Sequence, residues 1–161
     1  MQKITPFLWF DRNAEEAMNF YVSVFKDGKI HKIERYPEGP LEGPMQGFEG
    51  KVLTGVFEIL GQQFMALDGG PIFKFNESVS FLVECKDQAE IDYYWEKLSA
   101  VPASEQCGWC KDKFGLSWQI VPDMTRFFNE KDPEKSGRAM HAMLQMKKID
   151  VAGLEAAYEG K

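Results

Sequence analysis

The chain has 161 residues, of which 44% are hydrophobic and 14% aromatic, and its formal net charge is −6. This length suits one domain or two small halves that share a core, and the apolar content excludes an intrinsically disordered chain. The acidic balance, with no large cluster of Lys and Arg, argues against a nucleic-acid-binding protein.

Cellular location is constrained by the termini and the cysteines. No apolar run approaches the ~20 residues of a membrane-spanning helix, and the N-terminus MQKITPFLWF lacks the layout of a secretory signal. The odd set Cys85, Cys107 and Cys110 forms no disulfide framework and suits a reducing compartment. We therefore expect a cytoplasmic protein with no membrane partner.

The first half of the chain reads as a strand, a helix and three further strands. ITPFLWF (4–10) is rich in β-favouring side chains, and an apolar helical stripe follows it, with Asp11 or Asn13 as the expected cap. The stripe consists of Ala14, Ala17, Met18, Tyr21, Val22 and Phe25. Strands are expected at 30–36, 51–60 and 62–68, the last two forming a hairpin at Gly61.

Between those strands, PEGPLEGPMQGFEG (37–50) contains three Pro and four Gly, which predicts a loop. It is either a plain surface connector or a lid over a site.

The second half repeats this order. SVSFLVECKDQAEIDYYWEKLSA passes from a strand into a helix, and SEQCGWCKDKFGLSWQIVP gives two strands around the turn KDKFG. An additional strand is expected near 101–105. From Asp123 onward the chain is predicted to be helical, with Asp132 as a cap and Pro133 in the first helical turn.

Sliding the chain against itself aligns Phe7 with Phe81 and Leu8 with Leu82. Such a duplication indicates two modules, at about 1–70 and 76–122, followed by a helical tail at 123–161 in a single domain, 1–161. Each module alone would leave one sheet face bare, so two must pair, within one chain or across two.

Several long stretches resemble the PhnB-like group of the vicinal-oxygen-chelate superfamily, often labelled 3-demethylubiquinone-9 3-methyltransferase. They are PFLWFDRNAEEAMNFYVSVF, GQQFMALDGGP, GWCKDKFGLSWQIVP and DPEKSGRAMHAMLQMKKID. The resemblance implies an α+β fold in which two β-α-β-β-β modules form a curved, partly open mixed-sheet barrel. It also implies a cavity and a homodimer.

The resemblance also locates the positions at which metal-using members hold a cation. They fall at Pro6, Ser80, Met65 (Ala66 if the alignment slips by one) and Gln119. Transition metals prefer imidazole, carboxylate or thiolate ligands, which this set lacks. We therefore predict no metal and no cofactor.

The sequence favours a small apolar or aromatic ligand in the cavity, with no assigned catalytic residue. The expected ligand-binding residues are Gln119, Ser80, Met65, Phe10, Leu82, Trp109 and Trp118, with Phe57 beside them. An enzyme of the superfamily (isomerase, lyase or dioxygenase), a transferase as the label suggests, and a dimer without a ligand remain alternatives. No glycine-rich turn between strand and helix offers a methyl-donor site.

Four other features have competing interpretations. Gln119 either orients a ligand or only hydrogen-bonds Ser80 and backbone. Cys107 and Cys110 have the spacing of a redox pair, but residues three apart on a strand face opposite sides. We expect His31 at the surface and His141 in helix packing, and Glu84 either shares a face with Ser80 or lies in water at a strand end.

Overall fold

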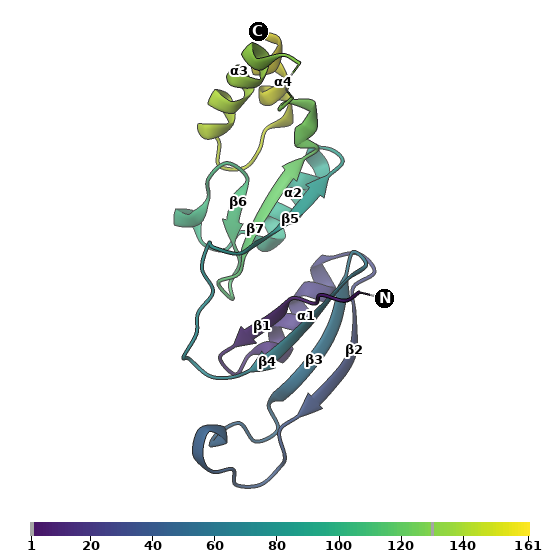
Figure 1. Ribbon diagram of the computed structural model, residues 1–161, viewed down its shortest axis with the longest axis vertical. Coiled ribbons are helices and arrows are strands. Elements are labelled where there is room, and N and C mark those ends of the chain that lie inside the picture. The colour runs from purple at the N-terminus through teal and green to yellow at the C-terminus, as the bar shows by residue number, and fades with distance from the viewer. Residues whose placement is uncertain (1, 130) are drawn as a thin grey trace. The chain divides into compact units, whose positions relative to one another are not determined.

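The computed structural model describes residues 2–129 and 131–161. The chain divides between Lys74 and Phe75 into two compact units, which we call the N-terminal and C-terminal units. Each unit contains one mixed β-sheet, and neither sheet closes on itself (Figure 1). The predicted α+β class is confirmed.

The N-terminal unit follows the predicted order of elements. Its elements are β1 (Phe7–Phe10), α1 (Ala14–Val24), β2 (Lys29–Arg35), β3 (Val52–Ile59) and β4 (Gln62–Asp68), with a short 3-10 helix, η1 (Gly43–Met45), in the long loop. The strands lie in the order β1-β4-β3-β2, with β1 parallel to β4 and the other pairs antiparallel. Leu60 and Gly61 both have positive φ, which two-residue hairpin turns of type I′ require. The hairpin at Gly61 is therefore confirmed.

Helix α1 packs against one face of this sheet. Because successive side chains on a strand point to opposite faces, every second residue meets the helix. The buried residues on that side are Leu8, Phe10, Phe57, Phe64 and Ala66, and those of α1 are Ala14, Ala17, Met18, Tyr21 and Val24. Burial of each large apolar side chain stabilises the unit by roughly 1.5–3 kcal/mol.

Asp68, at the end of β4, caps α1 from a distant part of the chain. Its side chain is buried and accepts hydrogen bonds from the backbone N–H of Ala14 (2.8 Å) and of Val52 (2.9 Å). Asn13 occupies the N-cap position but makes no side-chain capping bond. The expectation that Asp11 or Asn13 provides the cap is therefore wrong, because a buried carboxylate already satisfies the first helical N–H.

The C-terminal unit is built from β5 (Ser80–Cys85), α2 (Gln88–Leu98), β6 (Trp109–Lys111) and β7 (Ser117–Pro122). The strand order is β5-β7-β6, with β5 parallel and β6 antiparallel to β7. The strand expected near 101–105 is wrong, since this segment contains a 3-10 helix, η2 (Pro102–Ser104). Pro102 starts that helix because its fixed φ suits a first helical turn and it has no N–H to give to a sheet.

Asp112 organises the β6–β7 hairpin. The carboxylate is 1% exposed, and its Oδ1 accepts from the backbone N–H of Phe114 (2.8 Å) and Leu116 (3.1 Å). Its Oδ2 accepts from the indole Nε1 of Trp118 (2.9 Å). Burying a carboxylate is costly unless it is hydrogen-bonded, and here the partners are the turn backbone and a core indole. One carboxylate thus holds the turn and orients a core aromatic residue.

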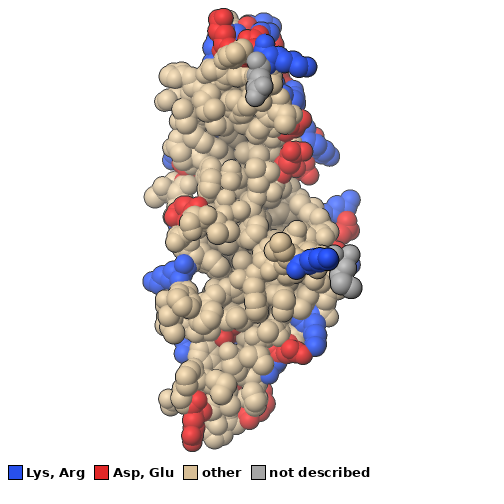
Figure 2. Space-filling view, viewed as in Figure 1, with Lys and Arg blue, Asp and Glu red and all other residues tan. Residues whose placement is uncertain are grey.

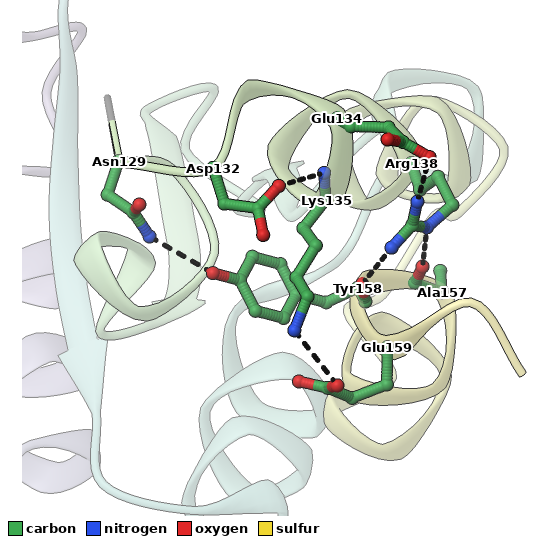
Figure 3. Close-up of polar contacts among 8 residues, drawn as sticks. All are labelled: Asn129, Asp132, Glu134, Lys135, Arg138, Ala157, Tyr158 and Glu159. Atoms are coloured by element: carbon green, nitrogen blue, oxygen red, sulfur yellow. Dashed lines mark hydrogen bonds and ion pairs between the residues drawn. The ribbon is translucent and has the colours of Figure 1, made fainter.

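The tail forms a helical hairpin beyond one end of the three-stranded sheet (Figure 1). Its elements are η3 (Met124–Arg126), α3 (Pro133–Leu144) and α4 (Val151–Glu159). Asp132 caps α3 by accepting from the Lys135 N–H (3.1 Å), as expected. Arg138 donates to the carbonyls of Ala157 and Tyr158, which joins α3 to the end of α4 (Figure 3).

The link between α3 and α4 fastens the tail to the C-terminal unit. Backbone N–H groups of Cys107 and Gly108 donate to the carbonyls of Met146 (2.8 Å) and Lys147 (2.7 Å), and Ile149 is fully buried. The tail is therefore part of the folded unit rather than a loose extension.

Asp112→Ala should destabilise the protein by about 3 kcal/mol, because three donors, one of them in the core, lose a charged acceptor. Chemical denaturation followed by tryptophan fluorescence measures this loss. Asp150→Ala is the matched control, since Asp150 is exposed and makes no side-chain capping bond. Equal stability losses in the two variants would contradict the role given to Asp112.

Candidate functional site

The side of the C-terminal sheet opposite α2, called here the open face, brings together most of the predicted ligand-binding residues. Leu82, Gln119 and Trp109 are register partners on β5, β7 and β6 and so form one row across the sheet. Leu82 is 56% exposed, and Gln119 and Trp109 are half-buried. An aliphatic, an amide and an aromatic side chain thus lie side by side.

The neighbouring row on the same face is polar and consists of Ser80, Ser117 and Lys111. Gln119 donates from Nε2 to the Ser80 Oγ at 2.9 Å, so the two rows are joined by a hydrogen bond. The expected hydrogen bond between Gln119 and Ser80 is therefore present, and it leaves open whether Gln119 also orients a ligand. The Ser80 hydroxyl accepts in this bond and keeps its own proton for another acceptor.

Lys111 is the cation of this face. Its side chain is only 20% exposed, and its ammonium group pairs with the Glu77 carboxylate, which is 59% exposed. The hydrogen bond from Lys111 lowers the pKa of Glu77. Glu84, two residues beyond Leu82 on β5, shares the open face and is exposed to solvent, as alternation along the strand predicts.

Ser117 was missed by reasoning from sequence. It is 1% exposed, and its Oγ has no hydrogen-bond partner among the described residues. Two-residue spacing from Gln119 signals the shared face, but burial of a small hydroxyl cannot be read from a strand pattern.

In the N-terminal unit, Met65 lies on the sheet face opposite α1. Phe7, its register partner on β1, is 50% exposed, and Trp9 and Leu67 form the next half-buried pair on that face. Trp9 donates from Nε1 to the Gly70 carbonyl (2.9 Å). The part of this face over β1 and β4 is therefore apolar and includes Met65, whereas the part over β2 and β3 carries polar residues such as Thr54 and Glu58.

Three residues grouped with these from sequence lie on the other, helix-covered faces. Phe10 and Phe57 are buried beneath α1, and Trp118 is held in the core by Asp112. Trp118 and Gln119 are consecutive on one strand and cannot share a face. Phe10, Phe57 and Trp118 therefore do not share a surface with the other predicted residues. Four of those, Ser80, Leu82, Trp109 and Gln119, lie on the open face, and Met65 lies on the face of the N-terminal sheet opposite α1.

Sheet register also corrects one of the four inferred metal positions. Phe7 on β1 is the register partner of Met65, and Leu82 on β5 is the register partner of Gln119, which is the position equivalent to Met65. Phe7 is therefore equivalent to Leu82, and the residue equivalent to Ser80 lies two before Phe7. That residue is Thr5, not Pro6. A one-residue slip in strand alignment caused the error.

The N-terminal pair offers a hydroxyl and a thioether and the C-terminal pair a hydroxyl and an amide, and neither pair has the ligands that a transition metal prefers. Within residues 2–129 and 131–161, no three His, Cys, Asp or Glu side chains gather as metal ligands. His31 is a surface residue that pairs with Glu58 at 2.9 Å, as expected of its position. His141 is exposed on α3, which corrects the expectation that it packs in a helix interface.

The three cysteines are free thiols in different environments. Burial raises the pKa of the Cys85 thiol and of the Cys110 thiol to about 12. Cys107 is half-buried in a turn, with φ of 50°, while Cys110 is in β6. Neither thiol lies at a helix N-terminus, and the pKa of Cys110 is raised rather than lowered, so the pair lacks the features of a redox motif.

A hollow of about 550 Å³ lies in the tail. It is lined by Arg126, Phe127, Ala152, Glu155, Ala156, Tyr158, Glu159 and Lys161. Arg126 pairs with Glu155, and Lys135 pairs with Glu159 at its edge. Four of its eight lining residues (Arg126, Glu155, Glu159 and Lys161) are charged, so it is a poorer candidate for an apolar ligand than the open face.

The distribution of charged side chains bears on nucleic-acid binding, and the lengths of the helices bear on membrane insertion. On the view in Figure 2, Lys and Arg are scattered among Asp and Glu and form no continuous basic area among the described residues. None of the helices in the described part of the chain is both long and apolar enough to cross a bilayer.

The strand–helix–strand arrangement that occurs in both units defines an α+β protein built from two related modules. Residues 2–121 match the sequence profile of the 3-demethylubiquinone-9 3-methyltransferase family. The chain belongs to this family. The match ends within β7, so α3 and α4 lie outside it, as does the stretch DPEKSGRAMHAMLQMKKID.

Solved structures agree with this assignment. A PhnB protein of Bacillus cereus, described as a 3-demethylubiquinone-9 3-methyltransferase, is 41% identical, with 74% of this chain and 99% of that chain covered and a TM-score of 0.62. Protein PA1353 of Pseudomonas aeruginosa is 19% identical over 76% of this chain and 97% of its own, with a TM-score of 0.56, and shows the fold alone. No curated protein matches the chain.

In the native protein, iodoacetamide at pH 8 should label Cys107 and leave Cys85 and Cys110 unmodified. A thiol with a pKa near 12 stays protonated at pH 8, and only the thiolate reacts. Mass spectrometry of labelled peptides gives the result, and labelling in denaturant provides the control in which all three react. Native labelling of Cys85 or Cys110 as fast as Cys107 would show that the core is not closed.

Proposed function

We propose that this chain binds a small apolar or aromatic molecule on the open face, without a transition metal. The observation that carries the proposal is the row Leu82–Gln119–Trp109, where exposed apolar and aromatic surface lies beside a satisfied amide. Apolar lining with a few fixed polar groups is the usual composition of a small-molecule site. Met65, on the N-terminal sheet, is the ligand-binding residue proposed in the other unit.

The chemistry of the four equivalent positions supports the metal-free part of the proposal. Thr5, Ser80, Met65 and Gln119 supply no imidazole, carboxylate or thiolate. The amide of Gln119 cannot titrate, and it already donates to Ser80. In this chain the pair would orient a polar group of the ligand rather than hold a cation.

We further propose a cytoplasmic homodimer, with neither a nucleic acid nor a membrane as a partner. Each sheet has a face without a helix of its own unit, and part of each such face is apolar, with Phe7 and Leu82 half-exposed there. Contiguous apolar surface of this kind is usually covered by protein or ligand. Size-exclusion chromatography with light scattering tests the dimer.

The family description favours a transferase as a second candidate. Its support is the match over residues 2–121. Methyl donors generally sit over a glycine-rich turn after a strand, whereas the β1–α1 link is Asp11–Arg12–Asn13 and the β5–α2 link is Lys86–Asp87. Calorimetric titration with S-adenosylmethionine distinguishes the candidates, since binding of this donor would favour the transferase.

Purified protein should contain far less than one equivalent of zinc, nickel, manganese or iron by elemental analysis. The reason is the weak donor set at all four positions. Stoichiometric metal that survives dialysis would contradict the metal-free proposal and favour an isomerase, lyase or dioxygenase.

A panel of neutral nitroaromatic compounds, including 4-nitrotoluene and 4-nitrobenzamide, should quench tryptophan fluorescence in a saturable manner. Nitroaromatic rings quench a tryptophan that they contact, and Trp109 lies in the site. Trp109→Phe should remove most of the saturable component. Trp95→Phe is the matched control, because Trp95 is also half-buried in this unit but lies on α2, across the sheet. No saturable quenching by any member of the panel would contradict ligand binding here.

A further inference from the structure

The buried hydroxyl of Ser117 forms no hydrogen bond with the described part of the protein. It is the buried side-chain polar atom without a hydrogen-bond partner in the part of the chain that the structure describes. Buried polar groups in native proteins are nearly always paired, so an orphaned one indicates a missing water, ion or ligand atom. Its position in the middle strand, between Ser80 and Lys111, places it at the centre of the polar row.

The polar row supplies several hydrogen-bond donors to one region. Ser117 has a free hydroxyl, Ser80 keeps its own proton after accepting from Gln119, and neighbouring strands lie about 4.8 Å apart. Lys111 adds an ammonium group with three donors, of which Glu77 uses one. Two hydroxyls and a cation side by side suit an acceptor with two oxygens.

The row next to it suits a ring. Leu82 and Trp109 lie on either side of Gln119, in the row displaced by two residues along the strands from the polar row, and both present apolar surface. Tryptophan stacks favourably on aromatic groups and has a polar edge. Because Ser117 is 1% exposed, a molecule that spans the two rows places its oxygens on the Ser117 hydroxyl only when neighbouring side chains move aside, and its ring then lies on Trp109.

We propose that the ligand is an aromatic carboxylic acid whose carboxylate is bound by Ser117, Ser80 and Lys111. The inference rests on the proposed function and adds the chemical class of the ligand. Lys111 is largely shielded from water, while its partner Glu77 is well exposed, so a ligand carboxylate can share or replace Glu77 on the ammonium group. A charged acceptor gains more from these donors than a neutral one does.

Glu84 sets the orientation of the acid. It lies at the opposite end of β5 from Ser80 on the same face. Glu77 also lies at the Ser80 end but is paired with Lys111, so the positive charge of Lys111 favours the ligand carboxylate there, Glu84 disfavours it at the other end, and the ring lies toward Leu82. The acid therefore binds in one direction.

The test compares 4-nitrobenzoate with 4-nitrobenzamide, which has nearly the same shape but no charge. Binding is followed by quenching of tryptophan fluorescence in the wild type, Ser117→Ala and Lys111→Gln. Ser104→Ala, a half-buried serine of η2, is the control. The wild type should bind the acid about tenfold more tightly than the amide, and each site variant should lose about tenfold in affinity for the acid and less than about threefold for the amide.

Stability gives a second reading. Ser117→Ala removes no hydrogen bond of the fold, so its denaturation midpoint should equal or exceed that of the wild type. A marked loss of stability would show that Ser117 serves the fold, which overturns the proposal.

The outcomes separate this inference from the proposed function. Equal affinities for acid and amide, unchanged in Ser117→Ala, would overturn the carboxylate site and leave apolar ligand binding in place. Failure of both compounds to bind would overturn both. A preference for the acid that only Ser104→Ala abolishes would place the site elsewhere and also overturn the inference.

Discussion

The geometry of the C-terminal unit depends on one buried carboxylate. Asp112 binds two backbone N–H groups of the turn and the indole of Trp118, so it fixes both the β6–β7 hairpin and the rotation of β7 about its axis. Once Trp118 is committed to the core, alternation commits Gln119 and Ser117 to the opposite face. Asp68 has a comparable function in the N-terminal unit, where it joins the start of α1 to β3. A buried carboxylate thus fastens distant segments together in each unit, and in the C-terminal unit it also fixes which side chains of β7 lie on the open face.

On that open face, a hydrogen bond between neutral side chains links the apolar row to the polar row. The bond between Gln119 and Ser80 joins β7 to β5 with neutral groups, which carry no charge penalty and attract no metal. The face keeps apolar surface on both sides of this bond, and a polar row beside it. Its chemistry is therefore that of a site which orients a molecule by shape and hydrogen bonding.

Much of the fold could be predicted from sequence, because the helical stripe of α1 and the hairpin at Gly61 are strong local signals. The errors came from contacts between distant residues and from strand register. The cap on α1 comes from Asp68, far along the chain, and no local pattern signals it. A shift of one residue moves a side chain to the other face, which is why Pro6 was chosen instead of Thr5.

The residues that the sequence groups as ligand-binding lie on both faces of the two sheets. Size and hydrophobicity grouped Phe10 and Trp118 with the ligand-binding residues, although both belong to cores. Ser117 could not be predicted from sequence, because neither the burial of its hydroxyl nor the absence of a hydrogen-bond partner among the described residues leaves a signal in the strand pattern. Composition predicts which residues prefer the interior, whereas register decides which face they occupy.

The most direct test of the account is the NMR response of individual side chains to a bound nitroaromatic compound. The indole N–H of Trp109 and the side-chain amide of Gln119 should shift on saturation, while the indole N–H of Trp118, held by Asp112 across the sheet, should stay in place. Shifts at Trp118 with none at Trp109 and Gln119 would contradict the claim that the open face is the binding surface.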